Sequence, residues 1–194
     1  MDVPVTPNPD AVPEEPARRG PVSAGATVSW LRDLVVSVLI AAVVILFLYQ
    51  PVRVEGTSMM PGLIDQERIF INKFAYRFGI SDIRRGDTVV FWYPGDPSKS
   101  FIKRVIGVPG DRVQVKDGRV SVNGAELNEP YVPDMYRDQI STAPRVVAPD
   151  EYYVLGDHRS SSNDSRMWGT VPRRYIYGKA SFVYWPLDRM GALP

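Results

Sequence analysis

Hydrophobic and polar positions divide the chain into three parts. Residues 1–29 carry six prolines, scattered charges and few large apolar side chains, a pattern that predicts a disordered tail. Residues 30–51 are dominated by an uncharged apolar run that predicts a helix. Residues 52–194 change to alternating and β-branched patterns, so we expect a mainly β domain there.

The apolar run Leu34–Tyr49 has the character of a membrane-spanning helix. Its sixteen residues would extend roughly 24 Å, against about 30 Å for a bilayer core, and counting on to Val52 brings the length close to spanning. A cleaved signal peptide and a buried helix are the alternatives, but no Ala-x-Ala motif follows and no polar face is visible. We expect an uncleaved anchor with residues 1–29 in the cytoplasm, because arginines precede the run.

Several runs after the apolar segment predict strands. Each is rich in β-branched and aromatic residues and stops at proline, glycine or a polar turn. One of them alternates about an Asp-Gly turn and predicts a hairpin, and proline-rich sequence follows it, so an inserted hairpin and loop region is expected over 113–149. The predicted strands cover residues 87–93, 101–108, 113–124 as the hairpin, 151–156 and 180–185.

Composition narrows the chemistry. The chain has no cysteine, which excludes disulfides, thiolate metal sites and a cysteine nucleophile. His158 is its only histidine, so a histidine-rich metal site is not expected, and we predict neither a metal nor a cofactor. The formal net charge of +1 gives no large basic face, so nucleic acid is not an expected partner.

Ser58 is a candidate nucleophile in the segment Gly56–Leu63. The glycines and Pro61 constrain the backbone there, and such a turn can expose a hydroxyl and aim N–H groups at an oxyanion. A serine hydroxyl needs a base to take its proton. An ordinary turn serine with a local hydrogen bond remains the alternative for this segment alone.

Lys103 is the candidate base. Strand alternation places Phe101, Lys103 and Val105 on one face, where the amine would be partly desolvated. Desolvation lowers the pKa of a lysine towards the range in which a base works near neutral pH. Arg104 cannot replace it, because a guanidinium keeps its proton in proteins. A lysine reaching to solvent at a strand edge is the alternative.

A polar loop over residues 156–166 completes the candidate site. Asp164 and Arg166 can pair and hold this loop in one geometry. One of its serines could hydrogen-bond a neutral lysine amine. An ordinary polar loop is the alternative that composition alone leaves open.

Four segments together resemble one family. The segment around Ser58 is followed by residues 85–91, by residues 103–111 and by the loop 156–166, in the order seen in bacterial type I signal peptidase. Each segment alone is suggestive, but four in order behind an apolar helix are very specific. The resemblance covers the apolar run and nearly all of the chain after it.

This resemblance implies a signal-peptidase-type β fold behind one N-terminal transmembrane helix. It implies a serine endopeptidase on the outer face of the cytoplasmic membrane that removes signal peptides from exported preproteins, with transient contact with the export machinery. Ser58 then matches the nucleophile, its backbone N–H the oxyanion donor, and Lys103 the general base. Further matches are Ser162, which orients the lysine, and Met59, Asp157, Asp164 and Arg166, which support the site.

Two positions depart from the resemblance. Gly56 stands where some relatives have a serine hydroxyl, so the oxyanion hole would rely on backbone N–H groups. His158 is followed by several serines, and spacing favours Ser162 over Ser160 and Ser161 as the partner of Lys103. A triad of Ser58, His158 and Asp164 is conceivable. A self-cleaving repressor-type protease and a non-enzymatic membrane-anchored β binding module are the other functional alternatives.

Overall fold

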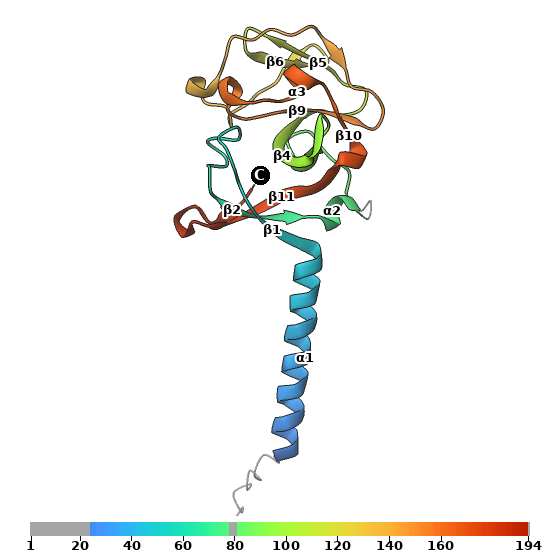
Figure 1. Cartoon of the computed structure of the whole chain (residues 1–194), viewed down its shortest axis with the longest axis vertical. Coiled ribbons are helices and arrows are strands. Elements are labelled where there is room, and N and C mark those ends of the chain that lie inside the picture. Colours follow the sequence, from blue (N-terminus) through green and yellow to red (C-terminus); the bar gives the residue numbers. More distant parts are fainter. Residues whose placement is uncertain (1–23, 78–80, 194) are drawn as a thin grey trace, which may run out of the picture. The chain divides into compact units, whose positions relative to one another are not determined.

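The computed structural model describes residues 24–77 and 81–193, and the chain divides into two units, residues 1–42 and 43–194. Helix α1 runs from Ala24 to Leu48 (Figure 1). Most of the predicted tail lies outside the described residues. Its last part was predicted wrongly, because residues 24–29 belong to α1, where Ala24 and Ala26 favour a helical backbone.

The predicted anchor corresponds only in part to α1. Within the described part of the chain, no helix combines the length and the apolar character that crossing a membrane requires. The helix also ends three residues before the predicted boundary. Residues Tyr49–Arg53 form strand β1 instead, in which Tyr49 lies opposite Asn72 and Arg53 opposite Arg68. Pro51 explains the change, since proline cannot continue a helix but is tolerated in a strand at a sheet edge.

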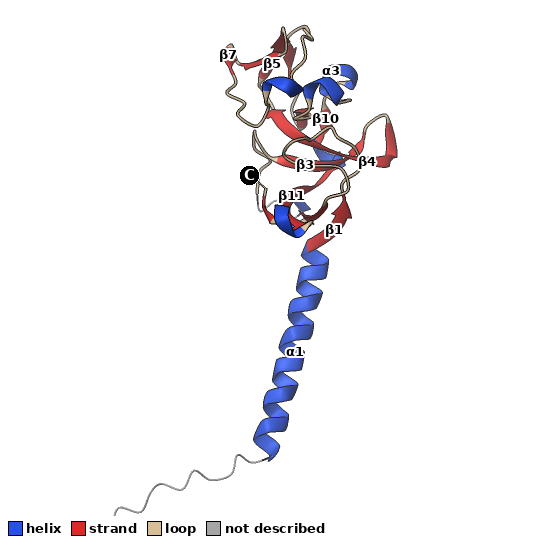
Figure 2. Cartoon of the chain, turned by 90° about the vertical axis from the view of Figure 1, so that its left-hand side faces the viewer, coloured by secondary structure: helices blue, strands red, loops and turns tan. Residues whose placement is uncertain are grey.

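The mainly β character of the remaining chain is confirmed. An eight-stranded antiparallel sheet has the order β1-β2-β11-β3-β4-β9-β10, with β12 paired to β11 (Figures 1 and 2). The predicted strand at 87–93 is β3, and the predicted strand at 101–108 begins earlier, as part of the longer β4. The bounds are β2 Arg68–Asn72, β3 Thr88–Tyr93, β4 Asp96–Gly107, β9 Glu151–Leu155, β10 Val171–Pro172, β11 Ile176–Trp185 and β12 Gly191–Ala192.

A smaller four-stranded sheet has the order β7-β6-β5-β8. It comprises β5 (Arg112–Lys116), β6 (Arg119–Val122), β7 (Ala125–Glu126) and β8 (Arg145–Val146). Strands β5 and β6 form the predicted hairpin, with Lys116 opposite Arg119 across the Asp-Gly turn. Alternating buried valines on both strands fit a sheet with one covered face.

Short helices connect the strands, and three apolar clusters hold the domain together. The helices are α2 Phe74–Arg77, η1 Asp134–Tyr136, η2 Arg159–Ser161, α3 Ser165–Trp168, η3 Arg173–Tyr175 and η4 Leu187–Arg189. One cluster contains Phe91 and Val105, and a second contains Met59, Leu63 and Val90. The third joins the β5–β6 hairpin to Ile106 and Leu155 of the larger sheet. The clusters therefore fix β4 from several sides.

Candidate active site

Ser58 lies in a tight turn between β1 and β2. Gly56 has a φ of +91° and its N–H donates to the Asp65 carboxylate, so the turn needs glycine at this position. The Met60 N–H donates to the Thr57 carbonyl at 3.1 Å. Met59 is 3% exposed and packs in the core beside Leu63. Because Met59 anchors the turn in the core, Ser58 is held in a defined position.

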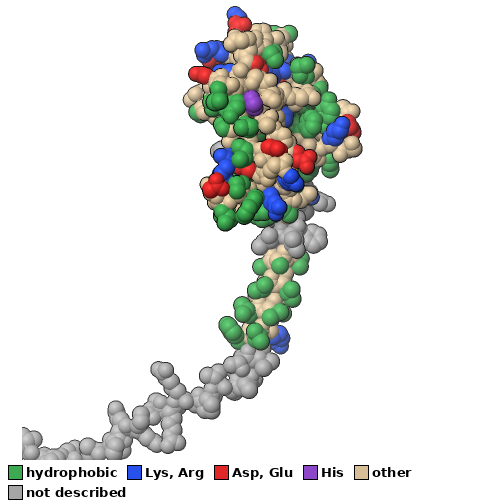
Figure 3. Space-filling view, turned by 60° about the vertical axis from the view of Figure 1, so that its left-hand side comes forward, with side chains coloured by type: hydrophobic (Ala, Val, Ile, Leu, Met, Phe, Trp, Pro, Cys, Tyr) green, Lys and Arg blue, Asp and Glu red, His purple; other side chains and the backbone are tan. Residues whose placement is uncertain are grey.

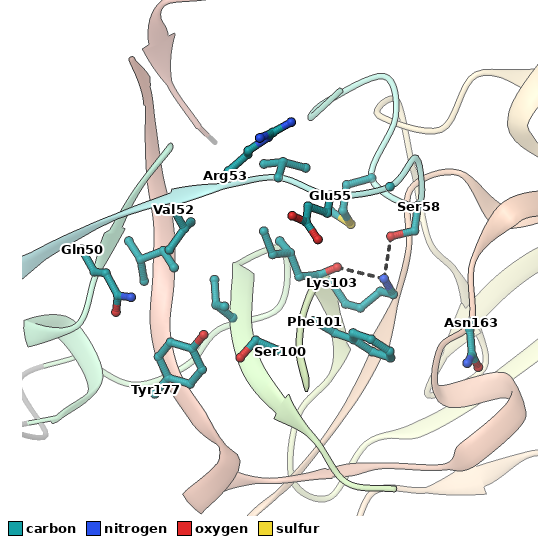
Figure 4. Close-up of a pocket in the computed structure, with 16 residues that line it drawn as sticks. Gln50, Val52, Arg53, Glu55, Ser58, Ser100, Phe101, Lys103, Asn163 and Tyr177 are labelled. Atoms are coloured by element: carbon teal, nitrogen blue, oxygen red, sulfur yellow. Dashed lines mark hydrogen bonds between the residues drawn. The ribbon is translucent and has the colours of Figure 1, made fainter. Parts of the chain in front are cut away.

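Lys103 comes from β4 and meets Ser58 directly. Its Nζ lies 2.6 Å from Ser58 Oγ and 3.0 Å from the Ile102 carbonyl oxygen (Figure 4). On β4 it lies opposite Val89 of β3, and the side chain is 4% exposed. The two residues are 45 positions apart in the sequence. The structure therefore brings the two predicted site residues into hydrogen-bond contact.

Burial sets the protonation of this lysine. It lowers the pKa of Lys103 from 10.5 to about 8, while the nearby carboxylates of Asp164 and Asp157 oppose it by raising that pKa. A lysine with such a pKa is partly neutral in mildly alkaline solution. The same 2.6 Å contact can then pass the hydroxyl proton of Ser58 to the amine.

A cavity of about 460 Å³ opens beside this pair. It is bordered by β1 and the serine turn on one side and by β4 on the other (Figure 4). Among the described residues, none accepts a hydrogen bond from the Ser58 N–H, which leaves that donor available to a ligand. Besides Ser58 and Lys103, the cavity wall includes Val52, Ile71, Val90, Phe101, Ile102, Asn163 and Tyr177.

The loop 156–166 packs against the serine turn. The His158 N–H donates to the Ser58 carbonyl at 3.1 Å. Gly156 lies so close that a Cβ on it would be 2.4 Å from the same carbonyl oxygen. Asp164 accepts from the Gly156 N–H and pairs with Arg166 at 2.8 Å, so the predicted Asp164–Arg166 contact is present. These contacts explain why this loop and the serine turn share one geometry.

The predicted bond between Ser162 and Lys103 is absent. The hydroxyl of Ser162 is buried and has no hydrogen-bond partner among the described residues. It instead lies against Gly156, where an added Cβ would be 2.2 Å from Ser162 Oγ. Ser162 lies in the predicted loop, but its hydroxyl packs on Gly156 and not on Lys103.

The histidine triad does not form. His158 Nδ1 lies 3.2 Å from the Thr57 carbonyl oxygen, and its ring contacts Tyr136. The Asp164 carboxylate is occupied by Arg166 and by the Gly156 N–H. No hydrogen bond between described residues joins His158 to Ser58 Oγ or to Asp164.

Buried arginine–carboxylate pairs support the site, and apart from Asp164–Arg166 none of these pairs was predicted from the sequence. Arg104 makes two hydrogen bonds to Asp157, at 2.9 and 2.7 Å. Arg159 makes two to Glu129, at 2.9 and 2.5 Å, and Arg166 also contacts Asp138. These partners are about 30 to 50 positions apart, so no local sequence pattern could have paired them.

Comparison with known proteins places most of the chain in one family. The family described as "Signal peptidase, peptidase S26" matches residues 27–185. A signal peptidase I of Leptolyngbya laminosa is 36% identical, covering 97% of this chain and 94% of that protein. A signal peptidase I P of Bacillus subtilis subsp. natto is 35% identical, covering 84% and 91%.

A crystal structure of a signal peptidase I from Enterococcus faecalis is also similar. It is 28% identical, with a TM-score of 0.47, and the match covers 52% of this chain and 98% of that chain. The family match extends over most of the chain, and the two relatives cover at least 84% of it. The chain therefore belongs to the signal peptidase, peptidase S26, family.

Proposed function

We propose that the chain is a serine endopeptidase that removes signal peptides from exported preproteins, with Ser58 as nucleophile and Lys103 as general base. The observation that carries this proposal is the 2.6 Å contact between a hydroxyl beside a cavity and a buried amine whose pKa is lowered to about 8. Family membership favours this function over a repressor-type protease or a non-enzymatic binding module.

The proposed reaction has two halves. Neutral Lys103 takes the proton of Ser58 as Oγ attacks the scissile carbonyl carbon, and the Ser58 N–H donates to the oxyanion that forms. The lysine ammonium then gives this proton to the leaving amine, and an acyl-enzyme ester remains. In the second half Lys103 removes a proton from water as the water oxygen attacks the ester carbonyl carbon, and the lysine ammonium then returns this proton to Ser58 Oγ as the acid product leaves.

The remaining predicted site residues have supporting roles in this proposal. Asp157, Asp164 and Arg166 hold the loop, and Met59 anchors the turn. Ser162 is not part of this support, because its hydroxyl packs on Gly156 and makes no hydrogen bond to Lys103 among the described residues.

The proposed substrate is an extended peptide lying in the cavity between β1 and β4. Small side chains at the two positions before the cut would lie against its wall, which Val52, Ile71 and Val90 make partly apolar. No cofactor is required, because a hydroxyl, an amine and a backbone N–H supply each step.

A membrane location is also part of the proposal. The uncharged run Leu34–Tyr49 supports an anchor, although the described helix does not itself meet the requirement for spanning. We propose the N-terminus in the cytoplasm and the β domain on the outer face, in reach of the export machinery. Protease added to intact spheroplasts should degrade the β domain, and full protection would contradict this orientation.

The dyad is tested by incubating the full chain in detergent with a preprotein and locating the cut. Ser58→Ala and Lys103→Arg should each abolish cleavage, because arginine keeps its proton. Matched controls are Ser160→Ala and Lys116→Arg, whose side chains are exposed outside the cavity, and both should cleave normally. Turnover of Lys103→Arg at the wild-type rate would contradict the proposed base.

A further inference from the structure

The backbone carbonyl groups of Thr57 and Ser58 both form hydrogen bonds with His158. His158 donates its backbone N–H to the Ser58 carbonyl at 3.1 Å, and its ring Nδ1 lies 3.2 Å from the Thr57 carbonyl oxygen. This residue lies a hundred and one positions after Thr57. The contact is therefore a tertiary clamp on the serine turn and not a feature of the turn itself.

The Thr57 carbonyl matters because it shares a peptide group with the Ser58 N–H. A trans peptide is planar, so its C=O and N–H point in opposite directions, and fixing one fixes the other. Of the described residues, only prolines follow a cis peptide bond, so the Thr57–Ser58 peptide is trans. The Ser58 N–H is the donor that the proposed reaction needs at the oxyanion.

Two donors converge on this carbonyl. The Met60 N–H reaches the Thr57 oxygen at 3.1 Å from within the turn, and His158 reaches it from the loop 156–166. Hydrogen bonds to a peptide carbonyl also polarise the group and strengthen its N–H as a donor. The two donors therefore determine both the direction and the strength of the Ser58 N–H.

The imidazole is itself held in place. Its ring meets Tyr136 edge to face, with centroids 4.4 Å apart and the planes at 69°. Figure 3 shows the histidine side chain, in purple, at the surface beside hydrophobic side chains. The acceptor at Thr57 is a carbonyl, which carries no proton, so the hydrogen bond requires the proton on Nδ1.

We propose that His158 is a positioning residue for the oxyanion hole: its Nδ1–H fixes the Thr57–Ser58 peptide so that the Ser58 N–H meets the oxyanion of the substrate. This inference rests on the proposed function. It gives the single histidine a role in which it exchanges no proton with the substrate. The hydrogen bond from the Ser58 N–H to the substrate oxygen strengthens only as charge develops on that oxygen. Loss of the His158 contact should therefore lower kcat and leave KM unchanged.

A pair of substitutions separates donation from packing. His158→Phe keeps a ring against Tyr136 but has no donor, whereas His158→Asn keeps an amide N–H near the position of Nδ1 but has no ring. We expect His158→Phe to lower kcat about 3- to 10-fold, well below the loss on removing a whole oxyanion donor. His158→Asn should restore kcat to within about twofold of the wild type. A larger loss of kcat in His158→Asn than in His158→Phe would show that His158 acts only by packing against Tyr136.

Binding of a peptide aldehyde gives a second readout, because its adduct with a serine carries an oxyanion. Its affinity should fall in His158→Phe by the same factor as kcat, while the affinity for an uncleaved substrate analogue stays constant. Equal affinity of the aldehyde for the wild type and His158→Phe would overturn the inference. Failure of the wild type to cleave any preprotein would instead count against the proposed function.

The tautomer can be measured without any activity. The chain has one histidine, so ring-nitrogen NMR of the ¹⁵N-histidine-labelled full chain in detergent gives one pair of signals. We expect the proton on Nδ1, and this signature should be absent from the equivalent spectrum of a urea-unfolded sample. A neutral ring with its proton on Nε2 would overturn the proposed hydrogen bond, whatever the kinetics of the variants.

Discussion

Arg104 and Asp157 join the strand of the lysine to the loop that holds the serine turn. The Arg104 guanidinium makes two parallel hydrogen bonds to the Asp157 carboxylate, and the two side chains are 7% and 1% exposed. Arg104 directly follows Lys103 on β4, and Asp157 directly precedes His158. A two-pronged contact of this kind fixes orientation as well as distance. It thereby sets the separation of the proposed base and the serine turn.

Removing one member of this pair should be severely destabilising. Asp157→Ala leaves a buried guanidinium without its carboxylate, so we expect a loss of about 3–5 kcal/mol in the free energy of unfolding. Glu126→Ala is the matched control, because the Arg119–Glu126 pair is 71% and 60% exposed and should contribute about 0–1 kcal/mol. Urea unfolding of both variants measures the difference. Equal losses in the free energy of unfolding would contradict the idea that burial makes the Arg104–Asp157 pair important for stability.

Gly156 should tolerate no side chain. A Cβ there would lie 2.4 Å from the Ser58 carbonyl oxygen and 2.2 Å from Ser162 Oγ. We expect Gly156→Ala to cost about 1–3 kcal/mol through overpacking and to lower kcat about tenfold or more, since it displaces the serine turn. Gly191→Ala is the control, because a Cβ there meets nothing within 4 Å. Thermal melts and peptide cleavage assays compare the two, and normal activity of Gly156→Ala would refute the close approach.

Patterns along the chain predicted what depends on local sequence. The β-branched run of β3 and the Asp-Gly hairpin of β5 and β6 follow from alternation and turn chemistry. Ser58 and Lys103 could be singled out because each stands in an unusual local setting. Resemblance to a family then supplied the link between them, which no spacing rule provides.

Features that depend on tertiary contacts could not be predicted. Arg159 pairs with Glu129 across 30 positions, and either residue alone looks like an ordinary surface charge. The predicted end of the helix at residue 51 was wrong, because pairing of β1 with β2 outweighs the apolar character of Tyr49 and Val52. Ser162 was misplaced because the absence of a Cβ at Gly156 lets its hydroxyl pack there.

Lys103 should lower the free energy of unfolding of the domain. Its pKa is about 8 in the folded chain and 10.5 as the ordinary value, so below pH 8 the folded protein carries the cost of a buried ammonium. Between these values the unfolded chain retains the proton that the folded chain has lost, and stability rises with pH. Lys103→Met should therefore be inactive yet more stable at pH 7, by about 1–3 kcal/mol.

This gain should shrink as the pH approaches 10.5, the ordinary pKa of the lysine. Urea unfolding of the wild type and Lys103→Met at pH 7 and pH 10 measures the trend, and the exposed Lys116→Met gives the control. A Lys103→Met variant that is less stable than the wild type at pH 7 would mean that the hydrogen bonds of Lys103 outweigh its desolvation. A gain that does not change with pH would show that the effect is packing alone.

The pH dependence of cleavage tests the same lysine through its reaction. Only the neutral amine can accept the Ser58 proton, so kcat/KM should rise through a limb with its midpoint near the lowered pKa of about 8. Below that midpoint each pH unit should cost about tenfold, which leaves little cleavage at pH 5. The measurement uses the full chain in detergent and a short peptide with alanine at both positions before the cut.

His158→Asn should show the same limb, because the histidine neither gives nor takes a proton in the reaction. A flat profile from pH 5 to 9, or an acidic optimum, would contradict a lysine base, and loss of the limb in His158→Asn alone would assign the titration to the histidine.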